Sequence, residues 1–103
     1  MKAIIKVNEK VEIREITNEE IFDILGDYYI ENLNTEAYTI LSDEEGTVEV
    51  LNKGHRYNEV ESPLVFVGCD DWGQETDLTE EAAEEILERM EFRNIIEILE
   101  RNF

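Results

Sequence analysis

The sequence is poor in the residues that build covalent or metal-held frameworks: it has one cysteine, one proline and one histidine in 103 residues. The single cysteine, Cys69, excludes an intramolecular disulfide. One histidine and one cysteine cannot make a structural zinc site alone. No stretch approaches the roughly 20 apolar residues of a membrane helix, and residues 1–7 lack the apolar core of a signal peptide. We therefore expect a soluble, cytoplasmic protein.

Basic residues are also scarce. The chain has 27 acidic and 9 basic residues, a formal net charge of -18. Residues 1–18 hold four basic and three acidic groups, so the excess lies almost wholly in residues 19–103. Such self-repulsion opposes a compact fold. A strongly negative surface repels nucleic acid and attracts proteins that bind nucleic acid.

Disorder is the obvious alternative for so acidic a chain. However, 42% of the residues are hydrophobic, and there are four Phe, four Tyr and one Trp. The apolar residues also recur at regular spacing, which a disordered acidic tail does not require. We expect a single folded domain over residues 1–103.

The first half predicts two hairpins and a short helix. Alternation predicts an N-terminal hairpin over residues 2–16. Thr17 and Glu20 have the spacing of a capping box for a helix that ends at Gly26. Residues 28–33 and 37–41 predict strands, 42–46 a turn and 47–51 the returning strand of a second hairpin.

The second half predicts one buried strand and a long helical region. Residues 52–61 and 70–77 predict polar loops, and the apolar run 63–68 predicts a central strand covered on both faces. Thr79 caps a helix with acidic residues in its first turn. Its apolar positions lose phase at residues 91–92, which predicts a break or a second short helix. The fold class expected is α+β, with a mainly antiparallel sheet of about five or six strands, one short internal helix and one or two C-terminal helices.

The C-terminal helix carries rows of glutamates four residues apart, and a rise of about 1.5 Å per residue brings their charges close to the spacing of one DNA strand. A solvated face is the alternative, but few lysines are interleaved with these glutamates. Trp72 in the preceding loop is expected to be an apolar anchor. The residues predicted to bind a partner are Asp70, Asp71, Trp72, Glu75, Asp77, Glu80, Glu81, Glu84, Glu85 and Glu88.

The only basic cluster after residue 18 is the loop Lys53-Gly54-His55-Arg56-Tyr57-Asn58. Its cations could bind an anionic ligand, with Gly54 allowing close backbone approach. The predicted ligand-binding residues are Lys53, His55, Arg56 and Tyr57. The alternative is a polar loop whose cations offset nearby acids.

The sequence contains no phosphate-binding glycine loop, Ser-His-Asp order, zinc ligand set or calcium-loop spacing. A Cys69–His55 nucleophile pair is formally allowed, but any chain with one residue of each type would allow it. We expect no enzyme activity, no metal or other cofactor and no direct contact with nucleic acid. Homodimerisation is a further hypothesis, through the apolar stripe Phe92, Ile95, Ile96, Leu99 and Phe103.

Residues 1–5, 54–58, 66–73 and 77–81 together resemble a family of small, uncharacterised acidic proteins of phages and mobile elements, chiefly of Firmicutes. In that family a strand ending in Val-Gly precedes an acidic, glycine-containing turn and a Leu-Thr-acidic helix start. The resemblance brings no catalytic residues. It implies an inhibitor of host defence, of the anti-CRISPR or anti-restriction type, acting in the host cytoplasm. The extension 92–103 departs from the family pattern.

The leading hypothesis is therefore an acidic inhibitor that blocks the nucleic-acid-binding surface of a host nuclease or CRISPR effector, in the manner of a DNA mimic. Two alternatives stay open. One is a domain that binds or sequesters a small charged ligand at the Lys53–Asn58 loop. The other is a self-assembling structural phage protein.

Overall fold

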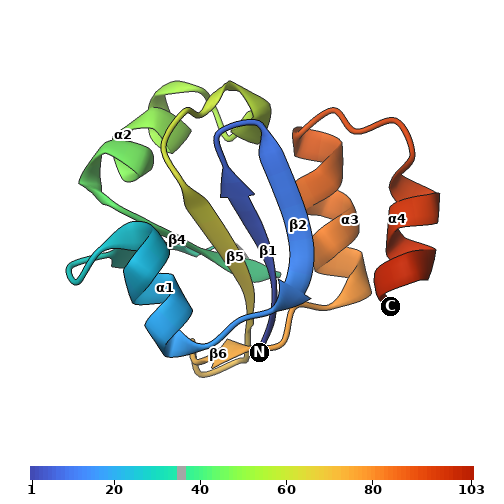
Figure 1. Cartoon of the computed structure of the whole chain (residues 1–103), viewed down its shortest axis with the longest axis horizontal. Helices are drawn as coiled ribbons and strands as arrows, with labels where there is room; N and C mark the ends of the chain where they lie inside the picture. The colour runs from blue at the N-terminus through green and yellow to red at the C-terminus, as the bar shows by residue number, and fades with distance from the viewer. Residues whose placement is uncertain (35–36) are drawn as a thin grey trace.

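The chain forms strands and helices in mixed order and ends in two helices (Figure 1). The computed structural model describes residues 1–34 and 37–103. The elements before residue 60 are β1 (Lys2–Val7), β2 (Lys10–Glu15), α1 (Asn18–Leu25), β3 (Ile30–Asn34), β4 (Tyr38–Ser42), α2 (Glu44–Asn52) and the 3-10 turn η1 (Tyr57–Glu59). They are followed by β5 (Leu64–Cys69), β6 (Glu75–Thr76), α3 (Glu80–Arg89) and α4 (Ile95–Asn102).

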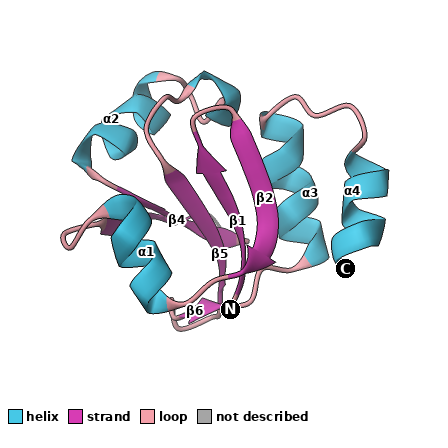
Figure 2. Ribbon diagram, in the orientation of Figure 1, coloured by secondary structure: helices cyan, strands magenta, loops and turns pink. Residues whose placement is uncertain are grey.

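The strands form one sheet in the order β2-β1-β5-β4-β3, and β6 adds a short hairpin to β5. Every pairing is antiparallel. Phe66 of β5 pairs with Ile4 on one side and Ile40 on the other, so β5 is the central strand. This confirms the α+β class and the central position predicted for residues 63–68. In the view of Figure 2, α1 and α2 lie to the left of the central strands and α3 and α4 lie to the right.

The N-terminal hairpin and the first helix form as predicted. β1 pairs with β2 from Lys2–Glu15 to Val7–Lys10, and Asn8 takes the positive φ of 57° that the tight turn requires. The Thr17 hydroxyl accepts from the Glu20 N–H, and the Glu20 carboxylate accepts from the Thr17 N–H, which completes the capping box.

The second predicted hairpin is wrong, because residues 44–52 form α2. The alternation of Val48 and Val50 with polar residues imitates a strand. The cap decides otherwise: the Asp43 carboxylate accepts from the Gly46 N–H at 2.7 Å, and two glutamates in the first turn suit the helix dipole. Val50 then becomes fully buried in the core, while Val48 stays exposed.

The core lies on both faces of the sheet. α1 covers one face, where Ile21 packs with Ile5 and Val65. α2, η1, α3 and α4 cover the other face, with Ile4 and Phe66 beneath them. Alternate residues of β1 and β5 therefore enter different cores, as expected for strands buried on both faces.

The predicted polar loop 52–61 is partly wrong, since it contributes the buried side chains Tyr57 and Val60. The Tyr57 hydroxyl lies 2.5 Å from that of Tyr38 inside the core. Burial and this hydrogen bond raise the pKa of Tyr57 far above its ordinary value.

The break predicted at residues 91–92 is confirmed. Glu91 has a φ of 60°, which ends α3, and α4 begins at Ile95. Leu99 of α4 is buried against the α3 side of the core. The Lys2 ammonium donates to the Asn102 carbonyl and lies 4.4 Å from the centre of the Phe103 ring. These contacts fasten the end of α4 to the start of β1.

The segment between β5 and α3 is held close to the sheet. A Cβ on Gly68 would lie 2.3 Å from the Asp77 carbonyl oxygen, so only glycine allows this approach. The Leu78 N–H donates to the Lys2 carbonyl at 2.9 Å. Among the described residues, no helix is long and apolar enough to cross a membrane.

Candidate functional site

The acidic side of α3 faces solvent. Ala82, Ala83, Ile86 and Leu87 point into the core, which turns the glutamates outward. Four of the five predicted glutamates are exposed: Glu80, Glu81, Glu84 and Glu88. Glu85 is half-buried and lies 3.8 Å from Arg89, a weak ion pair. This exposure follows from helical periodicity, because a buried row of glutamates would be too costly, and it is required both by a partner-binding face and by a solvated one.

A groove of about 470 Å³ runs between α3 and α4. Glu84 and Glu88 line one side, and Ile95, Ile96 and Glu97 line the other. Ile96 is 73% exposed, so an apolar side chain stands beside the acidic row. We call Glu80, Glu81, Glu84, Glu88 and Ile96 the α3 face.

The other predicted partner-binding residues lie in the segment 70–77 around β6, and they have two different roles there. The Asp70 carboxylate accepts from the Trp72 and Gln74 N–H groups, at 2.9 and 2.8 Å, and the Asp77 carboxylate accepts from the Lys2 N–H at 2.7 Å. These two carboxylates therefore hold the loop. Asp71 is exposed, and Trp72 is 88% exposed. Of the predicted partner-binding residues in this segment, these two are exposed, and the hydrogen bonds that hold the loop come from Asp70 and Asp77 instead.

Glu75 of β6 is turned inward. Its Oε1 atom is buried and has no hydrogen-bond partner among the described residues. Burial, and the charge of Glu31, raise the pKa of this carboxyl above its usual range. Glu75 is half-buried with one carboxylate oxygen turned inward, so it offers less of its carboxylate to a partner than the exposed acids do.

The predicted ligand loop does not converge on a site. Tyr57 is buried in the core, which overturns its assignment as a ligand contact. The Arg56 guanidinium is paired with the Glu59 carboxylate, and this pair lowers the pKa of Glu59. Lys53 caps the end of α2, and His55 has a φ of 61° and packs its ring against Tyr57, with ring centres 6.0 Å apart. The interpretation of this loop as a local structural turn fits these contacts.

His55 and Cys69 do not form a pair. Residues 53–58 precede β5, whereas Cys69 ends that strand at the edge where β6 pairs (Figure 1). No group of three His, Cys, Asp or Glu side chains in residues 1–34 and 37–103 could hold a metal ion.

Sequence reasoning missed Lys6, which is 4% exposed and lies in a second groove. The signal was present: Lys6 stands two residues after Ile4 in a strand, so both point to the same face. The charge of a lysine favours an outward position, but the alternation of the strand places Lys6 inward.

Comparison with protein families matches residues 1–91 to DUF3846, a domain of unknown function. The chain belongs to this family. The match spans the sheet and the helices α1, α2 and α3, and it ends before α4 begins. Comparison with curated proteins and with solved structures finds no match. The α3 glutamates thus belong to the family domain, while Ile96 of α4 lies outside the matched residues.

Proposed function

We propose that this protein is an inhibitor that covers the nucleic-acid-binding surface of a basic partner, such as a nuclease of a host defence system. The observation that carries the proposal is the α3 face: four exposed glutamates and an exposed isoleucine on one side of the molecule. A solvated helix that served only solubility would mix both signs more evenly. The earlier resemblance to small acidic phage proteins agrees with this role.

Electrostatics gives the proposed complex its mechanism. The negative potential steers a basic partner into encounter, and lysines or arginines that normally hold phosphates meet the carboxylates of Glu84 and Glu88. Ile96 lines the same groove as Glu84 and Glu88, and it supplies an apolar contact that excludes water. Trp72, which is 88% exposed on the loop before β6, is the second apolar contact of the proposed complex. Binding of this kind weakens as salt rises.

The experiment is a pull-down from a bacterial lysate at low and at high salt, followed by DNA competition with the captured protein. We expect a salt-sensitive partner that binds nucleic acid and releases it when this protein is added. Replacing Glu81, Glu84 and Glu88 by lysine is expected to reduce affinity at least about a hundredfold, since close charge pairs are each worth over 1 kcal/mol.

The matched control reverses Glu19, Asp23 and Glu44, which are exposed on α1 and α2 and change the net charge equally. It is expected to retain most of the affinity. Equal loss in both variants would mean that net charge, not the α3 face, governs binding. A partner that still holds its DNA in the complex would overturn the inhibitor role.

The self-assembly alternative loses part of its basis. Leu99 is buried within the protomer, and Ile95 and Ile98 pack against the same core. Of the proposed stripe, Ile96 and Phe103 stay well exposed, with Phe92 at 36%. A symmetric contact there would also bring the glutamates of two α3 helices close together.

A further inference from the structure

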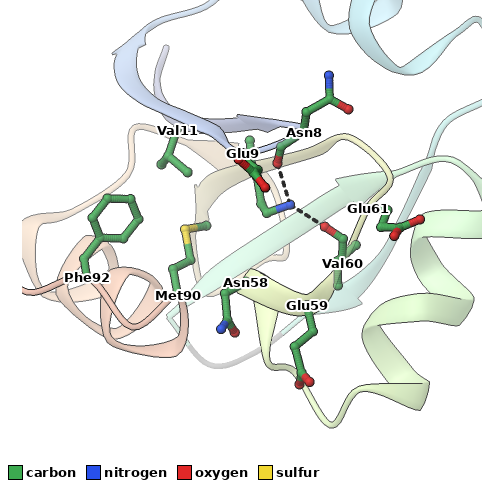
Figure 3. Close-up of a pocket in the computed structure, with 10 residues that line it drawn as sticks. Asn8, Glu9, Val11, Asn58, Glu59, Val60, Glu61, Met90 and Phe92 are labelled. Carbon is green, nitrogen blue, oxygen red and sulfur yellow. Dashed lines mark hydrogen bonds between the residues drawn. The ribbon is translucent and has the colours of Figure 1, made fainter.

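A groove of about 750 Å³ lies away from the α3 face, between the β1–β2 turn, η1 and the end of α3. Its lining is of three kinds. Val11, Met90 and Phe92 form an apolar side, as Figure 3 shows. Glu9 and Glu61 bring carboxylates to the groove, with Glu61 on the side away from Phe92 in Figure 3, and Lys6 brings a buried ammonium.

The ammonium of Lys6 is held by backbone carbonyls. It donates to the Asn8 carbonyl at 3.0 Å and to the Val60 carbonyl, as the dashed lines in Figure 3 mark. Within residues 1–34 and 37–103 these are its hydrogen-bond partners, and no carboxylate lies within ion-pair distance. An ammonium has three N–H donors, so one of them stays available to a ligand.

The carboxylates of Glu9 and Glu61 are exposed and form no ion pair among the described residues. Glu59, nearby, is already neutralised by Arg56. On the apolar side, Phe92 is 36% exposed, while Met90 is buried. The groove therefore presents a cation at its base, two free anions at its rim and an apolar wall.

We propose that this groove binds a small zwitterion with an apolar body, the class of amino acids and short peptides. The ligand carboxylate accepts the remaining N–H of Lys6. The ligand ammonium meets Glu9 and Glu61, and the apolar body lies along Val11 and Phe92. An anion without an amine is repelled by the rim, and a cation without a carboxylate is repelled by Lys6, so both charges of the ligand are needed. A cavity with an apolar wall and a few converging polar groups is the usual form of such a site.

The test uses the full chain and a matched set of probes: leucine, leucyl-leucine, its C-terminal amide and its N-acetyl derivative. Amide chemical shifts of the ¹⁵N-labelled protein report both affinity and location. Leucine or leucyl-leucine is expected to shift residues 6–11, 58–61 and 90–92. The amide and the N-acetyl derivative are each expected to bind about tenfold more weakly or worse, since each loses a charged hydrogen bond. Comparing the affinities of leucine and leucyl-leucine shows whether a free amino acid or a peptide is the better ligand.

Equal binding by the amide would show that the acidic rim alone attracts amines, and would overturn the proposal. Shifts spread over all acidic surfaces, or no shift with any probe, would overturn it as well. Glu61→Gln is expected to weaken leucyl-leucine about tenfold, whereas Glu100→Gln, on exposed α4 surface, leaves it unchanged. Both side chains are exposed, so both variants fold, and reversal of the three α3 glutamates leaves this binding intact.

Discussion

At the end of the sheet where β5 begins, Lys6 pairs with Leu64 and its side chain is buried. At the end where β5 finishes, Glu75, which is half-buried with its Oε1 atom turned inward, pairs with Cys69. Lys6 donates to two carbonyls, whereas Oε1 of Glu75 has no partner among the described residues. Burial moves both groups toward their neutral forms: it lowers the pKa of Lys6 and raises that of Glu75.

The surrounding acids separate the two cases. Glu49, Glu61 and Glu9 raise the pKa of Lys6 and so oppose its desolvation. Glu31 raises the pKa of Glu75 and so adds to its desolvation. The excess of negative charge therefore stabilises a buried cation and destabilises a buried anion, which gives it an effect inside the fold as well as on the surface.

The largest expected effect is at the Lys6 end. Lys6→Met removes the donor to the Val60 carbonyl, and because Val60 is buried, this oxygen cannot turn to water. We expect a loss of about 1–3 kcal/mol in the free energy of unfolding, measured by urea denaturation with an unchanged m-value. Lys10→Met, on the same hairpin but exposed and paired only with Glu12, should change stability by less than about 0.5 kcal/mol. Equal losses would mean that the carbonyl contacts are unimportant.

At the other end, Glu75→Gln is expected to stabilise the protein at neutral pH. The folded pKa of Glu75 is raised, so the ionised wild-type carboxylate destabilises the fold above its unfolded pKa of about 4.3, and this cost vanishes below that pH. The gain should therefore be present at pH 7 and shrink as the pH falls toward 4. Asp71→Asn, an exposed change in the same hairpin, should show no such trend. A Glu75→Gln variant less stable at pH 7 than the wild type would contradict this account.

The smallest effect is the response of the two pKa values to salt. Raising ionic strength screens the glutamates that raise the pKa of Lys6, and it also screens Glu31, which raises that of Glu75. Both values should therefore move downward, although burial shifts them in opposite directions. Side-chain NMR titrations at low and high salt measure this. Shifts of opposite sign would show that the surrounding charge does not set the difference between the two ends.

Much of the fold follows from local signals that tertiary contacts reinforce. The capping box of α1 and the apolar run of β5 belong to this class, and both were predicted correctly. For α2 the local signals conflict: Val48 and Val50 favour a strand, while Asp43 with two following glutamates favours a helix start. The conflict is resolved by burial of Val50 in the core, which no short window of sequence contains.

The candidate site also contains some residues whose exposure was predictable from the sequence and others whose burial was not. The exposure of the α3 glutamates follows from helical periodicity and was predictable. The burial of Tyr57, Leu99 and Lys6 depends on partners more than eighteen residues away, such as Tyr38 for Tyr57 and Val60 for Lys6. The polarity of a loop and the apolar periodicity of a helix do not contain that information. The groove lined by Lys6 is therefore identified only in the folded structure.

The place of β1 in the sheet bears on how the protein is made. β1 pairs with β2 at once, but Ile4 meets Phe66 only after 62 further residues have been synthesised. At 5–20 residues per second, that delay is about 3–12 s. A lone hairpin is marginally stable in water and leaves an open strand edge. The first strands of the nascent chain must therefore wait, unpaired on one side, until β5 leaves the ribosome.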